Sequence, residues 1–147
     1  MAGIKIRDAR SEDASDIVRL IQELAADDGV QSPINEAYAR YYLSQPHYHA
    51  LLAEADGLVM GLLAYMMKAD LFHGGETCYI SELIVTDGQR DRGIGSALMQ
   101  ALFHKLEEDG CVEVSVSTMP DNRGAIAFYR RHGMVDEAVF LEKHFKS

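Results

Sequence analysis

The stretch Glu82-Leu-Ile-Val-Thr-Asp-Gly-Gln-Arg-Asp-Arg-Gly-Ile-Gly-Ser-Ala-Leu-Met99 changes its hydrophobic period partway along. Residues 79–85 are mostly β-branched and apolar, which is typical of a strand, although Glu82 is set among them. From Ile94 onward an apolar residue recurs at every fourth position, at Leu98, Leu102 and Leu106, and this spacing is typical of a helix. The sequence therefore predicts a strand, a tight basic loop and a helix.

The loop has the composition of an anion-binding site. Gly93 and Gly95 fall at the start of the predicted helix, where a missing Cβ lets a bulky oxyanion approach unpaired backbone N–H groups. Arg90 and Arg92 flank them and add positive charge. The glycines alone also fit simple turn geometry, and the arginines alone fit a solvated patch. Together they predict a pyrophosphate site.

Two common phosphate motifs are excluded. No Gly-Lys-Ser/Thr follows the loop, so it is not a P-loop, and Leu98 stands where a dinucleotide fingerprint needs a third small residue. The sequence from Arg90 to Gly95 instead resembles the coenzyme A loop of the GNAT superfamily of N-acetyltransferases. Residues 122–134, Asn-Arg-Gly-Ala-Ile-Ala-Phe-Tyr-Arg-Arg-His-Gly-Met, resemble that family's next signature, with Met134 in place of the usual Phe.

The resemblance implies an α+β fold with a central mixed sheet covered by about four helices, in a single domain over residues 1–147. It also implies acetyl-CoA as co-substrate and a central strand that splays from its neighbour to admit the pantetheine arm. Backbone groups of the strand would pair with pantetheine, and those of the loop would bind the pyrophosphate. The residues expected to bind the cofactor are Leu83, Ile84, Val85, Arg90, Asp91, Arg92, Gly93, Ile94, Gly95, Ser96 and Asn122.

Tyr129 and Glu82 are the candidate catalytic residues. Tyr129 lies seven residues after Asn122, at the family's position for the general acid, and a phenol can protonate a thiolate leaving group. Its alternative role is core packing. Glu82 is a carboxylate within an apolar strand, where burial would raise its pKa and suit it to act as a base. A salt bridge is an equal alternative for Glu82, and His47, His49 and His73 are further candidates for the base.

Composition limits the remaining possibilities. A chain of 147 residues with 48% apolar and 25% charged residues is typical of a soluble domain with a real core. We expect no membrane partner, because no apolar run has the length of a membrane span, and a cytoplasmic location, because no signal core precedes residue 10. The net charge of −9 argues against nucleic acid and favours a cationic small-molecule acceptor. Cys78 and Cys111 are too few for a metal cluster, so we expect no metal.

Hydrophobic patterns predict the other elements. Strands are expected at residues 4–9, 48–54, 58–67, 112–117 and 135–141, and helices from an N-cap at Ser11 and over 35–43. Residues 68–76 read as a flexible connection. The acceptor is expected between the first two helices and this connection, where acidic residues would attract a cation or simply be solvated, and where three tyrosines would wall a pocket or pack the helix. These residues are Asp27, Asp28, Glu36, Asp70 and Glu76, with Tyr38, Tyr41 and Tyr42.

The leading hypothesis is an N-acetyltransferase that transfers acetyl from acetyl-CoA to a primary amine by direct attack. A non-catalytic acyl-CoA sensor is the alternative from another class, and the presence of Tyr129 argues against it. The tail after Gly133 is short for the family, so either one strand is missing or a partner subunit completes the sheet. A homodimer is the assembly that the resemblance suggests.

Overall fold

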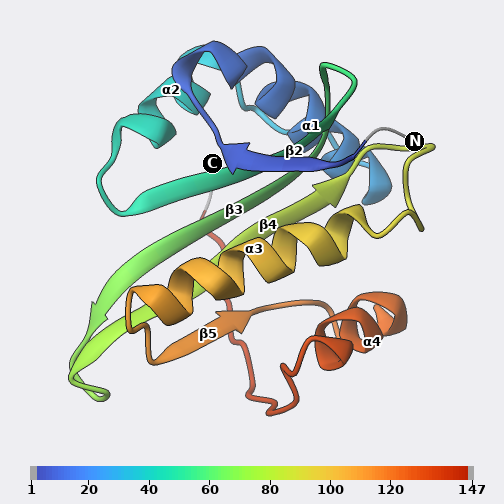
Figure 1. Cartoon of the computed structure of the whole chain (residues 1–147). Coiled ribbons are helices and arrows are strands. Elements are labelled where there is room, and N and C mark those ends of the chain that lie inside the picture. Colours follow the sequence, from blue (N-terminus) through green and yellow to red (C-terminus); the bar gives the residue numbers. More distant parts are fainter. Residues whose placement is uncertain (1–2, 146–147) are drawn as a thin grey trace.

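The computed structural model describes residues 3–145 and forms a five-stranded mixed sheet with helices on both faces (Figure 1). The strands are β1 (Lys5–Asp8), β2 (Tyr48–Ala55), β3 (Leu58–Asp70), β4 (Gly75–Val85) and β5 (Glu113–Val116). They lie in chain order across the sheet, and only β4 and β5 are parallel. The predicted α+β class with a mixed sheet is confirmed.

The helices come from segments with clear start signals. They are the 3₁₀ turn η1 (Ser11–Asp13), α1 (Ala14–Asp27), α2 (Glu36–Ser44), α3 (Ile94–Glu108) and α4 (Arg123–Arg131). Asn35 caps α2 by accepting a hydrogen bond from the Tyr38 N–H at 2.8 Å. At the first helix Ser11 is not the cap. Asp13 instead accepts the Arg10 backbone N–H at 2.7 Å.

Two hydrophobic cores lie on opposite faces of the sheet. α3 covers one face with Leu98, Met99 and Leu102, whose side chains are fully buried. α1 and α2 cover the other, where Leu20 and Leu52 are fully buried (Figure 1). Truncating any of these leucines to Ala would cost about 2–5 kcal/mol. The sheet is therefore held rigidly between two helical layers.

A glycine sets how closely α3 approaches the sheet. A Cβ on Gly61 of β3 would lie 3.1 Å from Cγ2 of Ile94 and 3.2 Å from Cδ1 of Leu98. Contacts that short are tight, and the side chains of Ile94 and Leu98 would have to move by a few tenths of an ångström. Gly61 therefore places the first turns of α3 directly over β3, beside the end of β4.

Two predicted segments differ in the structure. Residues 68–76 are not a flexible connection, because β3 runs to Asp70 and β4 begins at Gly75, with Asp70 accepting the His73 N–H at 3.2 Å in the turn between them. The predicted strand at residues 135–141 is also wrong. Its side chains are exposed, and within the described residues it pairs with no strand, so its alternating pattern has no ladder to join.

Candidate active site

A bulge in β4 decides which side chains face which core. Ala64 pairs with Glu82 but the next residue, Tyr65, pairs with Ile80, so Ser81 is an extra residue. Before the bulge Cys78 and Ile80 pack into the α3 core. A regular strand would send Glu82 the same way, but the bulge turns it to the α1–α2 face.

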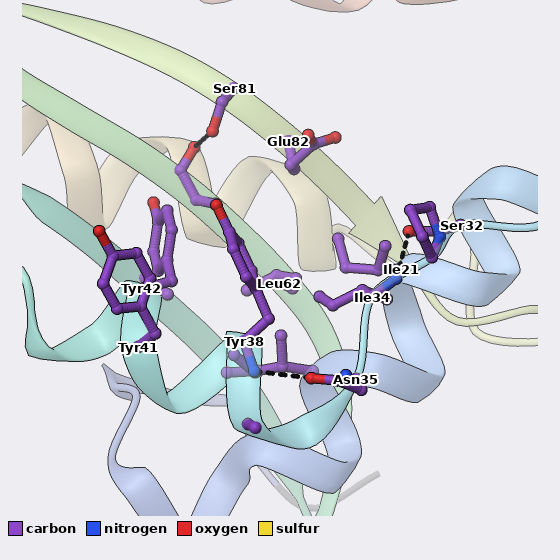
Figure 2. Close-up of a pocket in the computed structure, with 16 residues that line it drawn as sticks. Ile21, Ser32, Ile34, Asn35, Tyr38, Tyr41, Tyr42, Leu62, Ser81 and Glu82 are labelled. Atoms are coloured by element: carbon purple, nitrogen blue, oxygen red, sulfur yellow. Dashed lines mark hydrogen bonds between the residues drawn. The ribbon is translucent and has the colours of Figure 1, made fainter. Parts of the chain in front are cut away.

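Glu82 lines a pocket of about 680 Å³ on that face. Such a volume is typical of a small-molecule site. α1, α2, the segment that joins them and three strands form its walls, and Figure 2 shows Glu82 and Tyr38 on opposite sides of it. The lining residues are Ile17, Ile21, Ser32, Pro33, Ile34, Asn35, Ala37, Tyr38, Ala39, Tyr41, Tyr42, Ala50, Leu62, Ala64, Ser81 and Glu82.

The environment of Glu82 favours its neutral form. Burial raises the pKa of the Glu82 carboxyl above its ordinary value, because a low-dielectric pocket disfavours the charge. Burial also raises the pKa of Tyr129, and the negative charge of Glu82 raises it further. Glu82 lines the pocket, whereas Tyr129 packs against the α3 core and is not among the described residues that line the pocket.

The other predicted bases and acceptor-binding acids lie elsewhere. His49 stacks on Tyr65 in a second cavity with Asp8 and Lys105, and His73 pairs with Asp70 in the β3–β4 turn. The acidic residues predicted to attract the acceptor do not line the pocket among its described residues: Asp27 pairs with Arg90, Glu36 with Arg40 and Asp70 with His73.

The three tyrosines predicted for the pocket all line it. Tyr42 has a structural hydrogen bond, because its hydroxyl donates to the His49 carbonyl at 2.8 Å, and burial raises its pKa to about 12. Tyr38 and Tyr41 are more than half exposed, and their ring centroids lie 5.5 Å apart. These two rings form an aromatic edge on the pocket.

The β4–α3 loop ends in a helix N-terminus that has backbone donors available. Gly93 adopts φ +77° and nothing lies within 4 Å of where its Cβ would be. The first hydrogen bond of α3 runs from the Ala97 N–H to the Gly93 carbonyl at 2.9 Å. The N–H groups of Ile94, Gly95 and Ser96 precede that bond, so they have no acceptor within the helix. An anion would be stabilised here by these donors and by the helix dipole.

Two charged residues of the loop, Arg90 and Asp91, are constrained by the protein itself. The guanidinium of Arg90 donates to the Val85 carbonyl at 3.1 Å and to Asp27 Oδ2 at 3.0 Å. Asp91 adopts φ +67°, a left-handed conformation that favours glycine, and Asp is one of the few other residues that tolerate it. Asp91 therefore adds a negative charge to the loop and also suits the left-handed backbone conformation at this position.

Glu23 of α1 holds the loop in place. Its carboxylate accepts the Thr86 hydroxyl at 2.9 Å and the Asp87 N–H at 3.0 Å, and it pairs with Arg19 at 3.1 Å. Burial opposes its charge, yet these hydrogen bonds and Arg19 leave the pKa of Glu23 below its ordinary value. The loop is therefore tied to the helix that forms one wall of the pocket.

α4 packs beside this loop. Asn122 caps it by accepting the Ala125 N–H at 3.1 Å, and Phe128 lies against Gly95. Ser96 Oγ and His132 Nε2 lie 3.0 Å apart, which links the ends of α3 and α4. The sequence predicted neither the contact between Ser96 and His132 nor the bulge at Ser81. The only signal for the bulge was the break in alternation around Glu82.

β4 extends beyond the end of β5. Their pairing runs from Thr77–Glu113 to Ile80–Val116 and stops there. Within residues 3–145, the rest of β4 has no strand on that side. Leu83, Ile84 and Val85 therefore have a backbone edge without a strand partner on that side, within the described residues.

Within the described residues, no group of three or more His, Cys, Asp or Glu side chains is arranged to hold a metal ion. No helix in the described part of the chain combines the length and apolarity needed to cross a membrane.

The fold and the family model together define an acyltransferase of the acetyl-CoA-dependent class. The family model described as acetyltransferase (GNAT) family matches residues 16–134, and the chain belongs to that family. The predicted N-acetyltransferase activity with acetyl-CoA as co-substrate is thereby confirmed.

Curated relatives agree. The chain is 28% identical to an aminoalkylphosphonate N-acetyltransferase from Salmonella typhimurium, over 97% of this chain and 88% of the relative. It is 29% identical to a thialysine N-ε-acetyltransferase from Mus musculus, over 92% and 86%. An L-2,4-diaminobutyric acid acetyltransferase from Nocardia farcinica is 27% identical over 64% of this chain and 53% of the relative.

Solved structures share the fold. An aminoglycoside acetyltransferase from an uncultured soil metagenomic sample superposes with a TM-score of 0.84 at 21% identity, over 98% of this chain and 96% of the other. A protein from Bacillus halodurans described as a transcriptional regulator gives a TM-score of 0.85 at 21% identity, over 97% and 100%.

Proposed function

We propose that this protein transfers the acetyl group of acetyl-CoA directly to the primary amine of a small, cationic acceptor. The observation that carries the proposal is the position of Glu82. This half-buried carboxylate lines an acceptor-sized pocket and belongs to the strand whose free edge leads to the α3 N-terminus. The names of the relatives support an amine as the acceptor group.

Acetyl-CoA would bind along the free edge of β4. The pyrophosphate would accept hydrogen bonds from the N–H groups of Ile94, Gly95 and Ser96, next to the open space at Gly93. The pantetheine amides would pair with the backbone of residues 83–85 as an added strand. Asn122 uses its side-chain oxygen to cap α4, which leaves its NH₂ to donate to pantetheine. The same loop contributes the other residues expected to bind the cofactor, Arg90, Asp91 and Arg92.

The chemistry needs one base and one acid. Glu82 takes a proton from the acceptor ammonium, directly or through water, and the neutral amine attacks the thioester carbonyl carbon. The C–N bond forms, the C–S bond breaks, and backbone N–H groups of β4 stabilise the oxyanion between these steps. Tyr129 gives its proton to the departing thiolate, the acetylated nitrogen releases its second proton to solvent as the amide forms, and Tyr129 regains a proton from solvent. A phenol with its pKa raised still protonates an alkyl thiolate during bond cleavage, although the transfer is uphill at equilibrium.

Thiol release from acetyl-CoA with a panel of small amines tests this proposal. We expect turnover with at least one amine. Tyr129→Phe should lower kcat by about 10²-fold or more, the usual contribution of a general acid, and leave the acetyl-CoA Kd unchanged. Clear acetyl-CoA binding without turnover of any amine would contradict the proposal and favour the acyl-CoA sensor.

We also propose that the protein is a homodimer in which residues 135–145 of each chain pack on the other copy. This segment exposes apolar side chains, including Val139 at 84%, Leu141 at 87% and Phe145 at 81%. β5 ends the sheet and offers an open edge for a strand from a second chain. Light scattering should give twice the chain mass, and Leu141→Asp should give a monomer. A monomeric wild type would overturn this assembly.

A further inference from the structure

We propose that the acceptor has an apolar, alkyl or arylalkyl body with one or more amines and carries no carboxylate or phosphonate. The inference rests on the proposed function and names the substrate class for the pocket around Glu82. It follows from three properties of the pocket: its charge, its apolar walls and the aromatic edge.

Charge is the first property. Among the described residues that line the pocket, Glu82 is the only acid and none is Arg, Lys or His. An acceptor carboxylate would lose its hydration there without gaining a cationic partner, and it would meet the charge of Glu82 when that group is ionised. A primary ammonium, in contrast, needs no cationic partner and is attracted by the carboxylate of Glu82.

Two arginines on the helices that form the walls, Arg19 and Arg40, already have partners outside the pocket. Arg19 of α1 donates to the Val59 carbonyl at 2.8 Å and pairs with Glu23. Arg40 of α2 pairs with Glu36 at 3.6 Å. Neither lines the pocket, so neither meets an acidic group of a bound acceptor.

The walls and the edge favour an apolar body. Ile17, Ile21, Ile34 and Leu62 supply aliphatic surface on the α1 and strand sides. Figure 2 shows Tyr38 reaching from α2 toward β3 and β4, across from Ile21 and Ile34. An alkyl chain or aromatic ring between these groups would be removed from water on both sides, and the exposed ring of Tyr38 would lose its own contact with water.

This preference is opposite to what the relatives' names suggest. Aminoalkylphosphonates and 2,4-diaminobutyric acid both carry an acid group beside the amine. The chain shares its fold and its family with those enzymes. Recognition of an acid group on the acceptor, however, needs a cationic side chain, and none lines this pocket among the described residues. Family membership alone therefore predicts the wrong acceptors for this chain.

Matched pairs of acceptors that differ only in a carboxylate test the inference. The pairs are 2-phenylethylamine with L-phenylalanine, and cadaverine with L-lysine. For the full chain with acetyl-CoA we expect kcat/KM for each amine to exceed that of its amino acid by at least about 100-fold. Equal or reversed values in both pairs would overturn the inference while leaving the N-acetyltransferase function intact.

Ala37 offers a matched variant, because it is exposed, lies on α2 and lines the pocket. Ala37→Lys should narrow the ratio for each pair about tenfold by supplying the missing cation. Ala37→Gln, similar in size but neutral, should leave the ratio unchanged. A similar change in both variants would show that volume rather than charge controls selection, and this would contradict the inference.

If no acceptor is turned over, measurements of acceptor binding still distinguish the proposed acceptor class from the proposed reaction. Calorimetry with coenzyme A-saturated protein measures both pairs without chemistry. Tighter binding of the amines, by at least about 30-fold, would support the acceptor class even if the reaction proposal failed. Binding of neither member, or equal binding of both, would overturn the acceptor class.

Discussion

Gly95 of α3 lies directly against the ring of Phe128 on α4: a Cβ on Gly95 would be 3.3 Å from Cζ of Phe128. The sequence predicts that Gly95 lets the pyrophosphate approach the backbone. The structure adds a packing requirement, because the space beside this glycine is filled by a side chain adjacent to Tyr129 in the sequence. Gly95 therefore couples the anion-binding turn to the position of the candidate general acid.

We predict that Gly95→Ala lowers kcat about tenfold with a smaller effect on the acetyl-CoA Kd. The added methyl pushes Phe128 by a few tenths of an ångström and shifts Tyr129 with it, and small displacements of reacting groups are costly. Phe128→Leu in the same chain should restore most of the rate. Steady-state kinetics measure both. Gly93→Ala is the contrast: it strains a left-handed residue with open space around it and should mainly weaken acetyl-CoA binding. An unchanged kcat in Gly95→Ala would refute this coupling.

Asp91 places a carboxylate in a loop proposed to bind pyrophosphate. We predict that Asp91→Asn tightens acetyl-CoA binding about two- to fivefold, because it removes a like charge and keeps a residue that tolerates φ +67°. Calorimetry at low and high salt should show the gain shrinking as screening increases. Asp91→Ala, which lacks the charge but strains the backbone, should be less stable than Asp91→Asn. A gain that does not depend on salt would argue against the electrostatic reason.

Arg90 donates to Asp27 at 3.0 Å instead of pointing freely from the loop. If this pair competes with the pyrophosphate, Asp27→Asn should release Arg90 and tighten acetyl-CoA binding severalfold. The same substitution in an Arg90→Ala background should give no gain. This double-mutant cycle isolates the pair. An equal gain in both backgrounds would mean that Asp27 acts on the cofactor without Arg90.

The sequence predicted the strand, loop and helix around Gly93 well because these features are local. Gly93, the helix start at Ile94 and the strand before them depend on backbone conformation within a few residues. The cap of α4 by Asn122 is a local feature of the same kind.

Long-range arrangements were predicted less well. The bulge at Ser81 exists only relative to β3, so sequence alternation alone could not say which face Glu82 would meet. His49 and Glu82 both read as isolated titratable residues on strands, and only the fold puts them in different cavities. The segment at residues 135–141 has the composition of a strand, but a strand needs a partner edge, and local sequence does not report one.

The pH dependence of kcat should identify the base. Burial raises the pKa of Glu82, so its carboxylate becomes available only as pH rises through a value above the ordinary 4.5, and kcat should rise across that range. Tyr129 has its pKa raised above 10, so loss of its proton should not limit the rate below about pH 10. Glu82→Gln should lower kcat about 10²-fold and abolish the acidic limb. Profiles of the same shape in both proteins would exclude Glu82 as the base.

Stability should depend on Asp13, which joins β1 to the first helix. Its side chain is 8% exposed and receives two hydrogen bonds from Arg7, at 2.8 and 2.9 Å, besides that of the Arg10 N–H. These bonds and the charge of Arg7 lower the pKa of Asp13 in the folded state. Asp13→Asn should cost about 1–3 kcal/mol of unfolding free energy, because Arg7 loses the charge of its more buried partner and keeps the pair with Glu54 at 2.9 Å.

The sign of the pH effect follows from the lowered pKa. The stabilisation by Asp13 is fully present above the unfolded-state pKa of about 3.9, and it is lost as pH falls from there through the folded-state value. Urea denaturation should therefore give a constant difference between wild type and Asp13→Asn from pH 8 to pH 5, and a shrinking one below pH 4. Asp16→Asn is the control, since its pair with Arg19 is solvent-exposed and should contribute less than about 1 kcal/mol. Equal losses in the two variants would mean that burial of the Arg7–Asp13 pair adds nothing to its contribution.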